Sequence, residues 1–559
     1  MTREFDGKPV NYNDSPAPTQ DIPLYALEAP WTVKRALRAG RRWLLSQIEG
    51  FRSAFNSLLK NRFFTAGLLW ALTIIGNLLL LPNIGVVLLL GTIAAAVIRS
   101  GLNPFTTVVV FVIAIFVIPA RFALLGVSTS MLIGLAALTL WVFHRMANGP
   151  IKSERRHRID RWILIFLIAK LIAYANAQLH FRTENLVASA DRQVFVLLAF
   201  AGIGLYVAEV AKDEQMRDRL INLLVFGGAF MATTAILEQQ TGLDIGSMLR
   251  PPGFSVGGRL DGEGVLFAPE RFGVRRAFGN ATGPLEFTTM TLAVLPLAIH
   301  RAVHGRDRLE RRFGALMSFI IIVGLPMSVS RTAIVGLLLA LILIGLGLGS
   351  PERRRLAAGF GVTALFLLVT FSAVSNAFIQ LASSFFVETD TLNVGVSGRT
   401  SDFEIVGSLF RDRPILGTGL ASADPTVPRL VDGRRVRNLF LDNQYLSEVI
   451  SGGLVGLAAL VGLQNAGIGA ARRAKAIAVN SRNKNLSYSV AVSLMIMTLT
   501  FLFFDALSFR STTGLFFVLL GLAGALEASV RSTDETDGQT STGKLESNAS
   551  VPLPIPTIP

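Results

Sequence analysis

Three arginines are the residues whose type and position most clearly predict chemistry. They are Arg276 in "RFGVRRAFGNATGPLEF", Arg331 in "PMSVSRTAIVGLLLALILIG" and Arg399 in "VSGRTSDFEIVGSLF", and each lies beside an apolar run. A planar guanidinium can hold two phosphate oxygens through parallel hydrogen bonds, whereas a lysine ammonium is a point charge. These positions predict a phosphate or diphosphate site. An arginine-rich composition explains the loop arginines equally well, because arginine outnumbers lysine throughout the chain.

Arg331 joins two apolar runs that meet without a loop, so its side chain must lie at or just below a membrane surface. A charge at that depth costs roughly 3 kcal/mol unless it snorkels to the interface or is paired. Snorkelling is the ordinary explanation. The hydroxyls of Ser328 and Ser330 favour an anion site, but they could equally cap the helix that follows.

The junction after Arg275 and Arg276 has the features of an anion-binding helix start. Gly283 and Pro284 interrupt the chain there, and free backbone N–H groups at a helix start attract anions. Glu286 then lies about one turn into the apolar run, where an isolated carboxylate must be protonated or paired. We expect an outer arginine to be its partner.

Residues 400–410 have apolar side chains at helical spacing and predict an amphipathic helix on the outer surface. Arg399 would lie at the N-terminal end of this helix. A positive charge there opposes the helix dipole. Its position is therefore a poor choice for stability and favours a functional role.

The stretch "DNQYLSEVISGGLVGL" brings polar groups to the start of another apolar run. Asp442, Tyr445 and Val449 share one helical face, whereas Glu448 points elsewhere. Asp442 also occupies the position expected of an N-cap, and capping explains it as well as catalysis does. We take Asp442 as a candidate general base, with Asn443 and Tyr445 as candidate substrate-binding residues. The glycines that follow are expected to thin the helix for close packing: Gly452, Gly453 and Gly456.

The remaining ionisable residues do not predict a metal site. Asp505, in "FLFFDALSFR", either pairs with Arg510 or lines the path of an acceptor. The chain has no cysteine, which excludes a thiolate metal site and a thiol nucleophile. His180 reads as a solvated outer-loop residue, and the other histidines lie in or beside basic connectors: His144, His157, His300 and His304. We expect neither a metal nor a cofactor.

Helices in a membrane must position these residues. The 559-residue chain is 51% hydrophobic and 16% charged, and its apolar runs are long enough to cross a hydrocarbon core about 30 Å thick as helices. The sequence predicts an all-α polytopic bundle of about 12–14 spans. The candidate runs are residues 63–81, 83–98, 105–119, 123–143, 161–178, 193–211, 217–236, 284–303, 313–329, 331–349, 356–377, 442–467, 486–506 and 512–529.

The charges of the connecting segments predict the orientation. With the basic N-terminal region inside, connectors such as "HRAVHGRDRLERR" and "ARRAKAIAVNSRNKN" all fall on the cytoplasmic side, and both termini are cytoplasmic. The outer segments contain arginine but no lysine. Residues 1–62 are predicted to form a polar tail and a basic amphipathic helix that is either interfacial or packed against the bundle. Transmembrane helices are predicted at 63–236, 284–377 and 442–530, with extracytoplasmic loops at 237–283 and 378–441. Residues 531–559 are predicted to form a disordered cytoplasmic tail.

Together these motifs resemble the O-antigen ligase and O-antigen polymerase superfamily. The resemblance rests on Ser330-Arg331 at the start of a span, "RAFGN" to "GP" at 276–284, "SGR" at 397–399, "PILGTGL" at 414–420 and "DNQYLSEVISGGLVGL". It implies a GT-C-like membrane fold that transfers a glycan from undecaprenyl diphosphate to a hydroxyl acceptor on the outer face of a bacterial inner membrane, without a metal or nucleotide sugar. It also implies that Arg276, Arg331 and Arg399 hold the diphosphate.

The resemblance leaves the exact reaction open. Many ligases of this superfamily carry a His-Asn pair, with the histidine viewed as the base, where this chain has Asp442-Asn443. The difference slightly favours a polysaccharide polymerase over an O-antigen ligase, with a protein-glycosylating transferase third. A transporter or flippase of lipid-linked saccharide is the alternative of another class, but the polar residues lie at the outer rim and no internal repeat is evident. The expected donor is an undecaprenyl-diphosphate-linked glycan, and the expected acceptor is a glycan, lipid A-core or another molecule with a hydroxyl group. Membrane lipids and a chain-length regulator are further expected partners, and nucleic acid is not expected.

Overall fold

The computed structural model describes the chain from residue 104 onward, with gaps. The described residues are 104–119, 122–124, 127–147, 158–180, 184–243, 255–256, 270–383, 403, 406–422, 429–431, 434–436, 441 and 443–549. Contacts divide the chain into two units, 1–68 and 69–559, and every described residue belongs to the second. The predicted interfacial helix, the spans 63–81 and 83–98, Arg399 and Asp442 lie outside the described residues.

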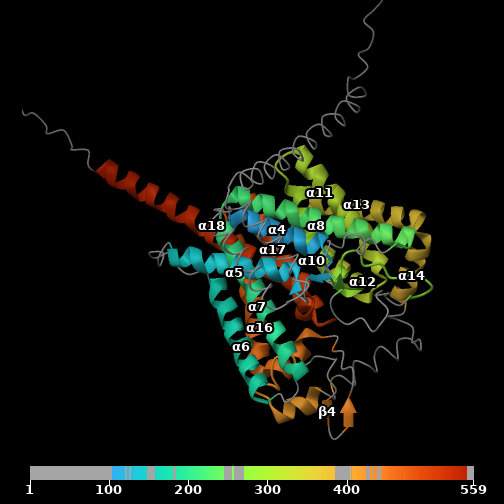
Figure 1. Ribbon diagram of the computed structural model, residues 1–559. Coiled ribbons are helices and arrows are strands. Elements are labelled where there is room, and N and C mark those ends of the chain that lie inside the picture. The colour runs from blue at the N-terminus through green and yellow to red at the C-terminus, as the bar shows by residue number, and fades with distance from the viewer. Residues whose placement is uncertain are drawn as a thin grey trace, which may run out of the picture. The chain divides into compact units, whose positions relative to one another are not determined.

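The described chain is helical almost throughout, which confirms the predicted all-α bundle (Figure 1). Its longer helices are α4 (Pro104–Val117), α5 (Thr129–Ala147), α6 (Arg158–His180), α7 (Glu184–Val210), α8 (Glu214–Thr241), α10 (Pro284–His304), α11 (Arg308–Gly324), α12 (Arg331–Gly347), α13 (Ser350–Thr370), α14 (Ser372–Ser383), α16 (Gln444–Ile477), α17 (Ser481–Thr500) and α18 (Arg510–Ala549), and its 3₁₀ turns are η2 (Leu325–Ser328) and η3 (Ala506–Ser508).

Five strands of two or three residues accompany the helices. The antiparallel strands β1 (Phe122–Leu124), β2 (Val127–Ser128) and β3 (Ser255–Val256) form one small sheet in the order β2-β1-β3. The strands β4 (Arg429–Val431) and β5 (Arg434–Val436) form a hairpin. These strands lie in connections between helices and do not change the fold class.

The chain is a multi-pass membrane protein, and its described residues contain fewer full-length spans than the sequence predicts for them. Among the described residues, six helices are long and apolar enough to cross a membrane, or seven if the bent pair α13 and α14 counts as one. The other described runs form helices that are shorter or more polar. The predicted span 356–377 is not one continuous helix: α13 starts at Ser350, where the Glu352 carboxylate accepts from the Gly349 N–H, and α14 turns away from it by 114°.

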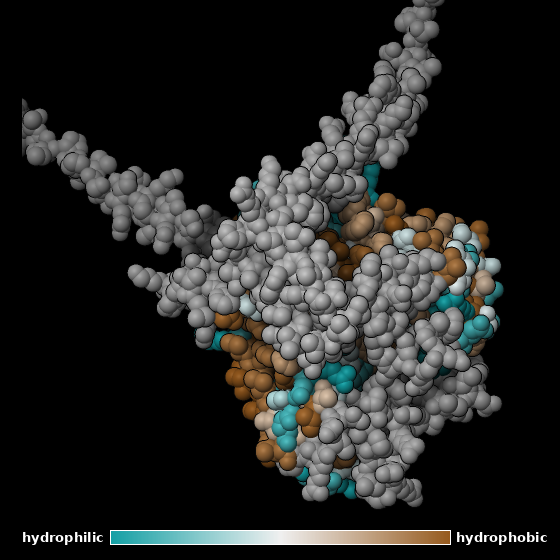
Figure 2. Space-filling model, in the orientation of Figure 1, coloured by the Kyte–Doolittle hydropathy of each residue, from teal (hydrophilic) through white to brown (hydrophobic). Residues whose placement is uncertain are grey.

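Helix α10 lies at the centre of the described bundle and packs against α8, α11, α12 and α17 (Figure 1). Every side chain from Glu286 to Arg301 is buried. Figure 2 shows apolar side chains across much of the visible described surface. Ile342, Leu346 and Val369 are 59%, 70% and 77% exposed, which suits a surface in contact with lipid tails rather than water.

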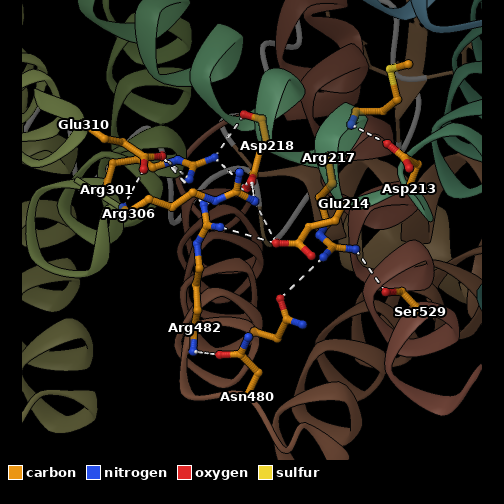
Figure 3. Close-up of polar contacts among 12 residues, drawn as sticks. Asp213, Glu214, Arg217, Asp218, Arg301, Arg306, Glu310, Asn480, Arg482 and Ser529 are labelled. Atoms are coloured by element: carbon orange, nitrogen blue, oxygen red, sulfur yellow. Dashed lines mark hydrogen bonds and ion pairs between the residues drawn. The ribbon is translucent and has the colours of Figure 1, made fainter. Parts of the chain in front are cut away.

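An ion-pair network ties five helices together at one end of the bundle (Figure 3). The Asp218 carboxylate of α8 pairs with three guanidinium groups, those of Arg301, Arg306 and Arg482. Arg301 also pairs with Glu310. Further members from α8, α17 and α18 make polar contacts at the same end: Glu214, Arg217, Asn483 and Ser529. We call this end of the bundle the network end.

The described parts of the predicted chemical motifs lie at the opposite end of the same helices. Helix α10 starts directly after "RAFGNATG" and reaches the network after 21 residues, about 30 Å away at 1.5 Å per residue. Helix α17 runs from the network to the 501–509 connection, and α18 runs from that connection past Ser529 at the network to Ala549. We call the end formed by residues 270–283, 325–331, 441–453 and 501–510 the site end. The predicted cytoplasmic connectors and the predicted outer motifs thus separate to the two ends.

Candidate functional site

The "RAFGN" loop is fixed by a buried carboxylate of α8 that the sequence analysis did not single out. Glu238 is 1% exposed, and its Oε2 accepts from the backbone N–H groups of Phe278 and Gly279 at 3.1 and 2.8 Å. The Arg275 guanidinium lies 3.6 Å from Glu238 Oε1 and donates to the Gly242 carbonyl at 2.6 Å. These contacts give Arg275 a structural role in holding the loop.

Glycine is required at position 279 of this loop. Gly279 has φ +55°, and a Cβ there would lie 2.4 Å from Thr234 Oγ1 and 2.8 Å from the Met231 carbonyl oxygen. The next side chain, Asn280, donates to the Phe116 carbonyl at 3.1 Å. Close packing of the loop against α8 and α4 therefore explains the residues at positions 279 and 280 of the motif.

Arg276 connects this loop to the turn that precedes Arg331. Its Nε donates to the Ser328 carbonyl at 3.1 Å, and the adjacent Ala277 N–H donates to the Met327 carbonyl at 3.0 Å. Arg271 donates to the Val329 carbonyl at 3.3 Å. Two motifs about fifty residues apart in the sequence thus form a single structure that carries four arginines: Arg271, Arg275, Arg276 and Arg331.

The turn before Arg331 has an unusual backbone. Val329 has φ +41°, which a β-branched residue rarely adopts. The Ser328 hydroxyl lies 3.1 Å from that of Thr288 and donates to the Leu325 carbonyl. Ser330 is the N-cap residue of α12 by backbone, but its hydroxyl makes no capping bond. The capping explanation for the two serines is therefore wrong, and Ser330, 2% exposed, lies directly before Arg331.

The charge of Arg276 is held in an unfavourable environment. Burial, together with the positive charge of Arg271, lowers the pKa of its guanidinium to about 10. The group stays charged at neutral pH. A bound anion would offset both the desolvation and the repulsion, so this loop has the electrostatics of an anion site.

Glu286 has backbone N–H groups as its hydrogen-bond partners, and the expected outer arginine, Arg510, interacts with its charge without forming an ion pair with it among the described residues. The side chain is fully buried, and its carboxylate accepts from the Thr282 N–H at 2.7 Å and from the Thr512 N–H at 3.4 Å. It lies between the first turns of α10 and α18, where unsatisfied N–H groups and two helix dipoles favour a negative charge. Glu286 therefore joins the start of α10 to the start of α18.

The start of α16 shows which polar residue caps the helix. Asn443 is the N-cap residue, and its side-chain oxygen accepts from the N–H groups of Tyr445 and Leu446 at 2.9 and 3.3 Å. The capping explanation for Asp442 is wrong by one residue. The Tyr445 hydroxyl donates to the Thr498 carbonyl at 2.8 Å inside the bundle. Substrate-binding roles for Asn443 and Tyr445 remain predictions.

The motifs "PILGTGL" and "ISGGLVGL" fit into each other. Helix α16 breaks at Gly453, where φ is +60° and ψ is −154°. The N–H groups of Thr418 and Gly419 donate to the carbonyls of Ile450 and Ser451, while those of Leu454 and Val455 donate to Pro414 and Ile415. Gly453 thus allows a break in α16 that the inserted loop stabilises, and not only the close helix packing that the sequence predicts.

The sequence analysis missed a buried ion pair at the site end. Lys170 of α6 donates to both carboxylate oxygens of Glu448, and the two residues are 4% and 1% exposed. Helical phase alone did not predict a role for Glu448, because its partner Lys170 lies on another helix, 278 positions away in the sequence. The detectable signal was Lys170 itself, the one charged residue between positions 162 and 178 of the apolar run.

Asp505 lies in the connection between α17 and α18, because α17 ends at Thr500 and not at the predicted residue 506. Its carboxylate accepts from the Ser508 hydroxyl, and the expected pairing with Arg510 does not occur in the described structure. Burial raises the pKa of Asp505 to about 6. This carboxyl group therefore titrates close to neutral pH.

The described site residues are connected across one end of the bundle. Glu286 joins the arginine loops to α18 through Thr512. The Leu507 N–H donates to Gln444 Oε1 at 2.6 Å, and the Gln444 N–H donates to the Phe501 carbonyl at 2.9 Å, which joins the 501–509 connection to α16. Contacts thus run from the arginine loops to the first turn of α16.

Among the described residues, no three histidine, aspartate or glutamate side chains converge as a metal site. His300 and His304 lie on α10 near the network end, with ring centres 5.5 Å apart. The side chains of His144, His157 and His180 lie outside the described residues.

The comparison with known families agrees with this geometry. Residues 316–461 match the model of the family described as O-antigen ligase. The matched segment contains Ser330-Arg331, "PILGTGL" and "DNQYLSEVISGGLVGL", while the "RAFGN" loop precedes it. No curated protein matches the chain.

Proposed function

We propose, starting from the O-antigen ligase domain that residues 316–461 carry, that the protein is an inner-membrane glycosyltransferase of surface-polysaccharide biosynthesis. The family implies lipid-linked glycan substrates. The proposed donor is an undecaprenyl-diphosphate-linked oligosaccharide, and the proposed acceptor is a hydroxyl group of a growing glycan. The site end would face away from the cytoplasm, with both termini inside.

The observation that carries the proposal is the contact between two arginine motifs. The Arg276 side chain donates to Ser328 in the turn that leads to Arg331, with Arg271 donating to the neighbouring Val329. Guanidinium groups gathered at the end of a membrane bundle suit a diphosphate, whose charge must be held beside the hydrocarbon core. The transfer site would therefore lie where the carrier head group meets the bundle.

The proposed mechanism is a displacement at the anomeric carbon of the donor sugar. Negative charge develops on the diphosphate as the glycosidic bond breaks, and fixed guanidinium groups would stabilise this charge without reorganising. Arg276 and Arg331, with Arg399, would hold the leaving group. Asp442, next to the Asn443 cap, is the predicted base for the acceptor hydroxyl. No step in this scheme calls for a metal.

Polymerase activity is slightly favoured over ligase activity. The resemblance places a histidine in many ligases where this chain has Asp442. The matching family is described as O-antigen ligase, which supports lipid A-core as the alternative acceptor. A polymerase would also be expected to work with membrane lipids and a chain-length regulator.

A deletion strain distinguishes the two reactions. Glycans are extracted from cells with and without the gene and separated on gels. A polymerase predicts that the length ladder on the lipid carrier collapses to a single repeat unit. A ligase predicts instead that long chains accumulate on the carrier, and that result would contradict the preference for polymerase.

Purified protein in liposomes separates transfer from transport. Lipid-linked oligosaccharide and acceptor are supplied on the same side of the bilayer, so that no translocation is needed. The proposal predicts a longer or transferred glycan. Movement of the lipid-linked substrate across the bilayer without transfer would instead identify a flippase.

A further inference from the structure

Three ionisable side chains gather at the site end outside the arginine loops. Lys170 of α6 and Glu448 of α16 form a buried ion pair. The pKa of Asp505, in the 501–509 connection, is shifted by the charges of both residues. The diphosphate proposal gives none of the three a role.

The structure makes room for the Glu448 carboxylate. A Cβ on Gly456 would lie 3.2 Å from Glu448 Oε2, and a Cβ on Gly452 would lie 3.9 Å from it. The Lys170 ammonium also lies 5.4 Å from the centre of the Phe166 ring. A buried ion pair often stabilises a fold no better than an apolar pair of the same volume. Its presence among membrane helices therefore points to a role beyond stability.

Gln444 links this ion pair to the connection that carries Asp505. Its Nε2 donates to Glu448 Oε1 at 3.1 Å, and its Oε1 accepts from the Leu507 N–H at 2.6 Å. Asp505 lies two residues before Leu507 and accepts from the Ser508 hydroxyl. The position of Asp505 thus depends on a chain of contacts that begins at Lys170.

We propose that Lys170 and Glu448 are positioning residues that hold Asp505 as the carboxylate that receives the acceptor's proton during glycan transfer. This inference rests on the proposed function. The acceptor O–H bond breaks as its oxygen bonds to the anomeric carbon, and the anomeric carbon–oxygen bond to the diphosphate breaks with its electron pair going to the diphosphate. The proton ends on Asp505, and this balance is the same if Asp442 takes the proton first.

The ionisation of Asp505 supports this role. Burial raises its pKa to about 6 and the charge of Glu448 also raises it, while hydrogen bonds from Ser508 and Ser447 and the charge of Lys170 lower it. Asp505 can accept a proton above this pH and cannot below it. Glu448 has a larger effect than Lys170, so neutralising both residues should lower the pKa of Asp505. The next charged group along the chain, Arg510, lies near Arg192 and Glu286.

The test is the pH dependence of transfer by full-length protein in liposomes, measured across about pH 5 to 8. We expect the wild-type rate to fall at low pH with a midpoint near 6. Asp505→Asn should lower the rate about a hundredfold or more and remove this acid limb, while Asp505→Glu should keep a limb. Thermal unfolding of each variant verifies that it is folded.

The decisive variant combines Lys170→Met with Glu448→Gln, which removes both charges and leaves Asp505 in place. We expect transfer to persist with its midpoint moved to lower pH. The matched control combines Arg473→Met with Glu527→Gln, a bidentate pair between α16 and α18 on the distant part of α16. This control should lose stability without moving the midpoint.

Two results would overturn the inference. One is an unmoved midpoint in the folded Lys170→Met, Glu448→Gln variant, and the other is a wild-type rate and acid limb in Asp505→Asn. Either result, with active wild-type protein, leaves the proposed function standing. Folded wild-type protein that does not transfer glycan at any pH would instead remove the proposed function itself.

Discussion

Arg276 and Arg331 come from separate loops that the structure joins through Ser328. Arg276 commits one of its five N–H donors to this contact, and burial together with the charge of Arg271 lowers its pKa to about 10. Arg331 begins α12 and is half-buried. A bound diphosphate would relieve the repulsion between Arg276 and Arg271 and the cost of burying the Arg276 charge. These residues therefore favour anion binding over a purely structural role.

We predict that Arg276→Ala and Arg331→Ala each lower the transfer rate about a hundredfold or more, because a fixed donor to the developing charge is lost. Arg331→Lys should recover only part of the activity, since lysine keeps the charge but not the planar fork. The rate is measured at saturating donor in liposomes. Arg354→Ala, an exposed arginine of α13, is the control and should transfer at the wild-type rate. Equal losses in the control and the site variants would contradict specific binding.

The structure joins the two loops that carry the predicted arginines Arg276 and Arg331, whereas the contacts of the acidic residues differ from those predicted. Motif position identified Arg276 and Arg331, because each is next to an apolar run. It placed the cap of α16 one residue early and set Glu448 aside, since helical phase gives the face of a side chain but not the helix that packs against it. Glu238 and Lys170 were missed for the same reason.

At the scale of elements, the break in α16 and the loop 414–420 form one unit. Their backbones exchange hydrogen bonds on both sides of Gly453. Gly417, with φ +68°, lies so close that a Cβ there would be 2.5 Å from the Ile450 carbonyl oxygen. Two glycine-rich motifs are therefore explained by one contact, which holds the first turns of α16 at the site end.

We predict that Gly453→Ala destabilises the protein and reduces transfer. Its Cβ would lie 2.4 Å from the Ile415 carbonyl oxygen at a φ of +60°, and that backbone conformation alone costs roughly 1–2 kcal/mol for an L-residue. The melting temperature in detergent should fall. Gly359→Ala in α13 is the control, because a Cβ there meets nothing within 4 Å, and it should not destabilise the helix. Equal melting temperatures for wild type and Gly453→Ala would contradict the backbone strain predicted for alanine at position 453.

Local patterns predicted the helices but not how they are interrupted. The run 356–377 reads as a single span, yet the chain bends by 114° after Thr370. The docking of "PILGTGL" into α16 depends on backbone groups of residues 32–40 positions apart, which side-chain periodicity does not encode. Apolar length therefore overestimates the number of continuous spans.

At the scale of the whole molecule, charge separates the two ends of the described bundle. Asp218, 13% exposed, receives three guanidinium groups at the network end, while those predicted site residues that the structure describes lie at the other end of the same helices. The alternating basic connectors predicted this separation, because the positive-inside rule depends only on which connections carry Lys and Arg.

We predict that Asp218→Asn costs about 3 kcal/mol of stability, because it leaves the largely buried Arg301 and Arg482 without their shared partner. Glu209→Gln, which breaks the more exposed pair with Lys212, is the control and should cost less than about 1 kcal/mol. Thermal unfolding in detergent compares the two. The folded fraction of Asp218→Asn should still transfer glycan, since its site end is intact. A loss of transfer without a loss of stability would place the network in the reaction.

The most direct test of the central claim is glycan transfer by purified protein in liposomes that contain lipid-diphosphate-linked oligosaccharide and a hydroxyl acceptor on the same side. We predict that wild-type protein forms a longer or transferred glycan and releases the lipid diphosphate, and that folded Arg276→Ala and Arg331→Ala proteins do not. Folded wild-type protein that forms no product, or arginine variants that work at the wild-type rate, would contradict the account.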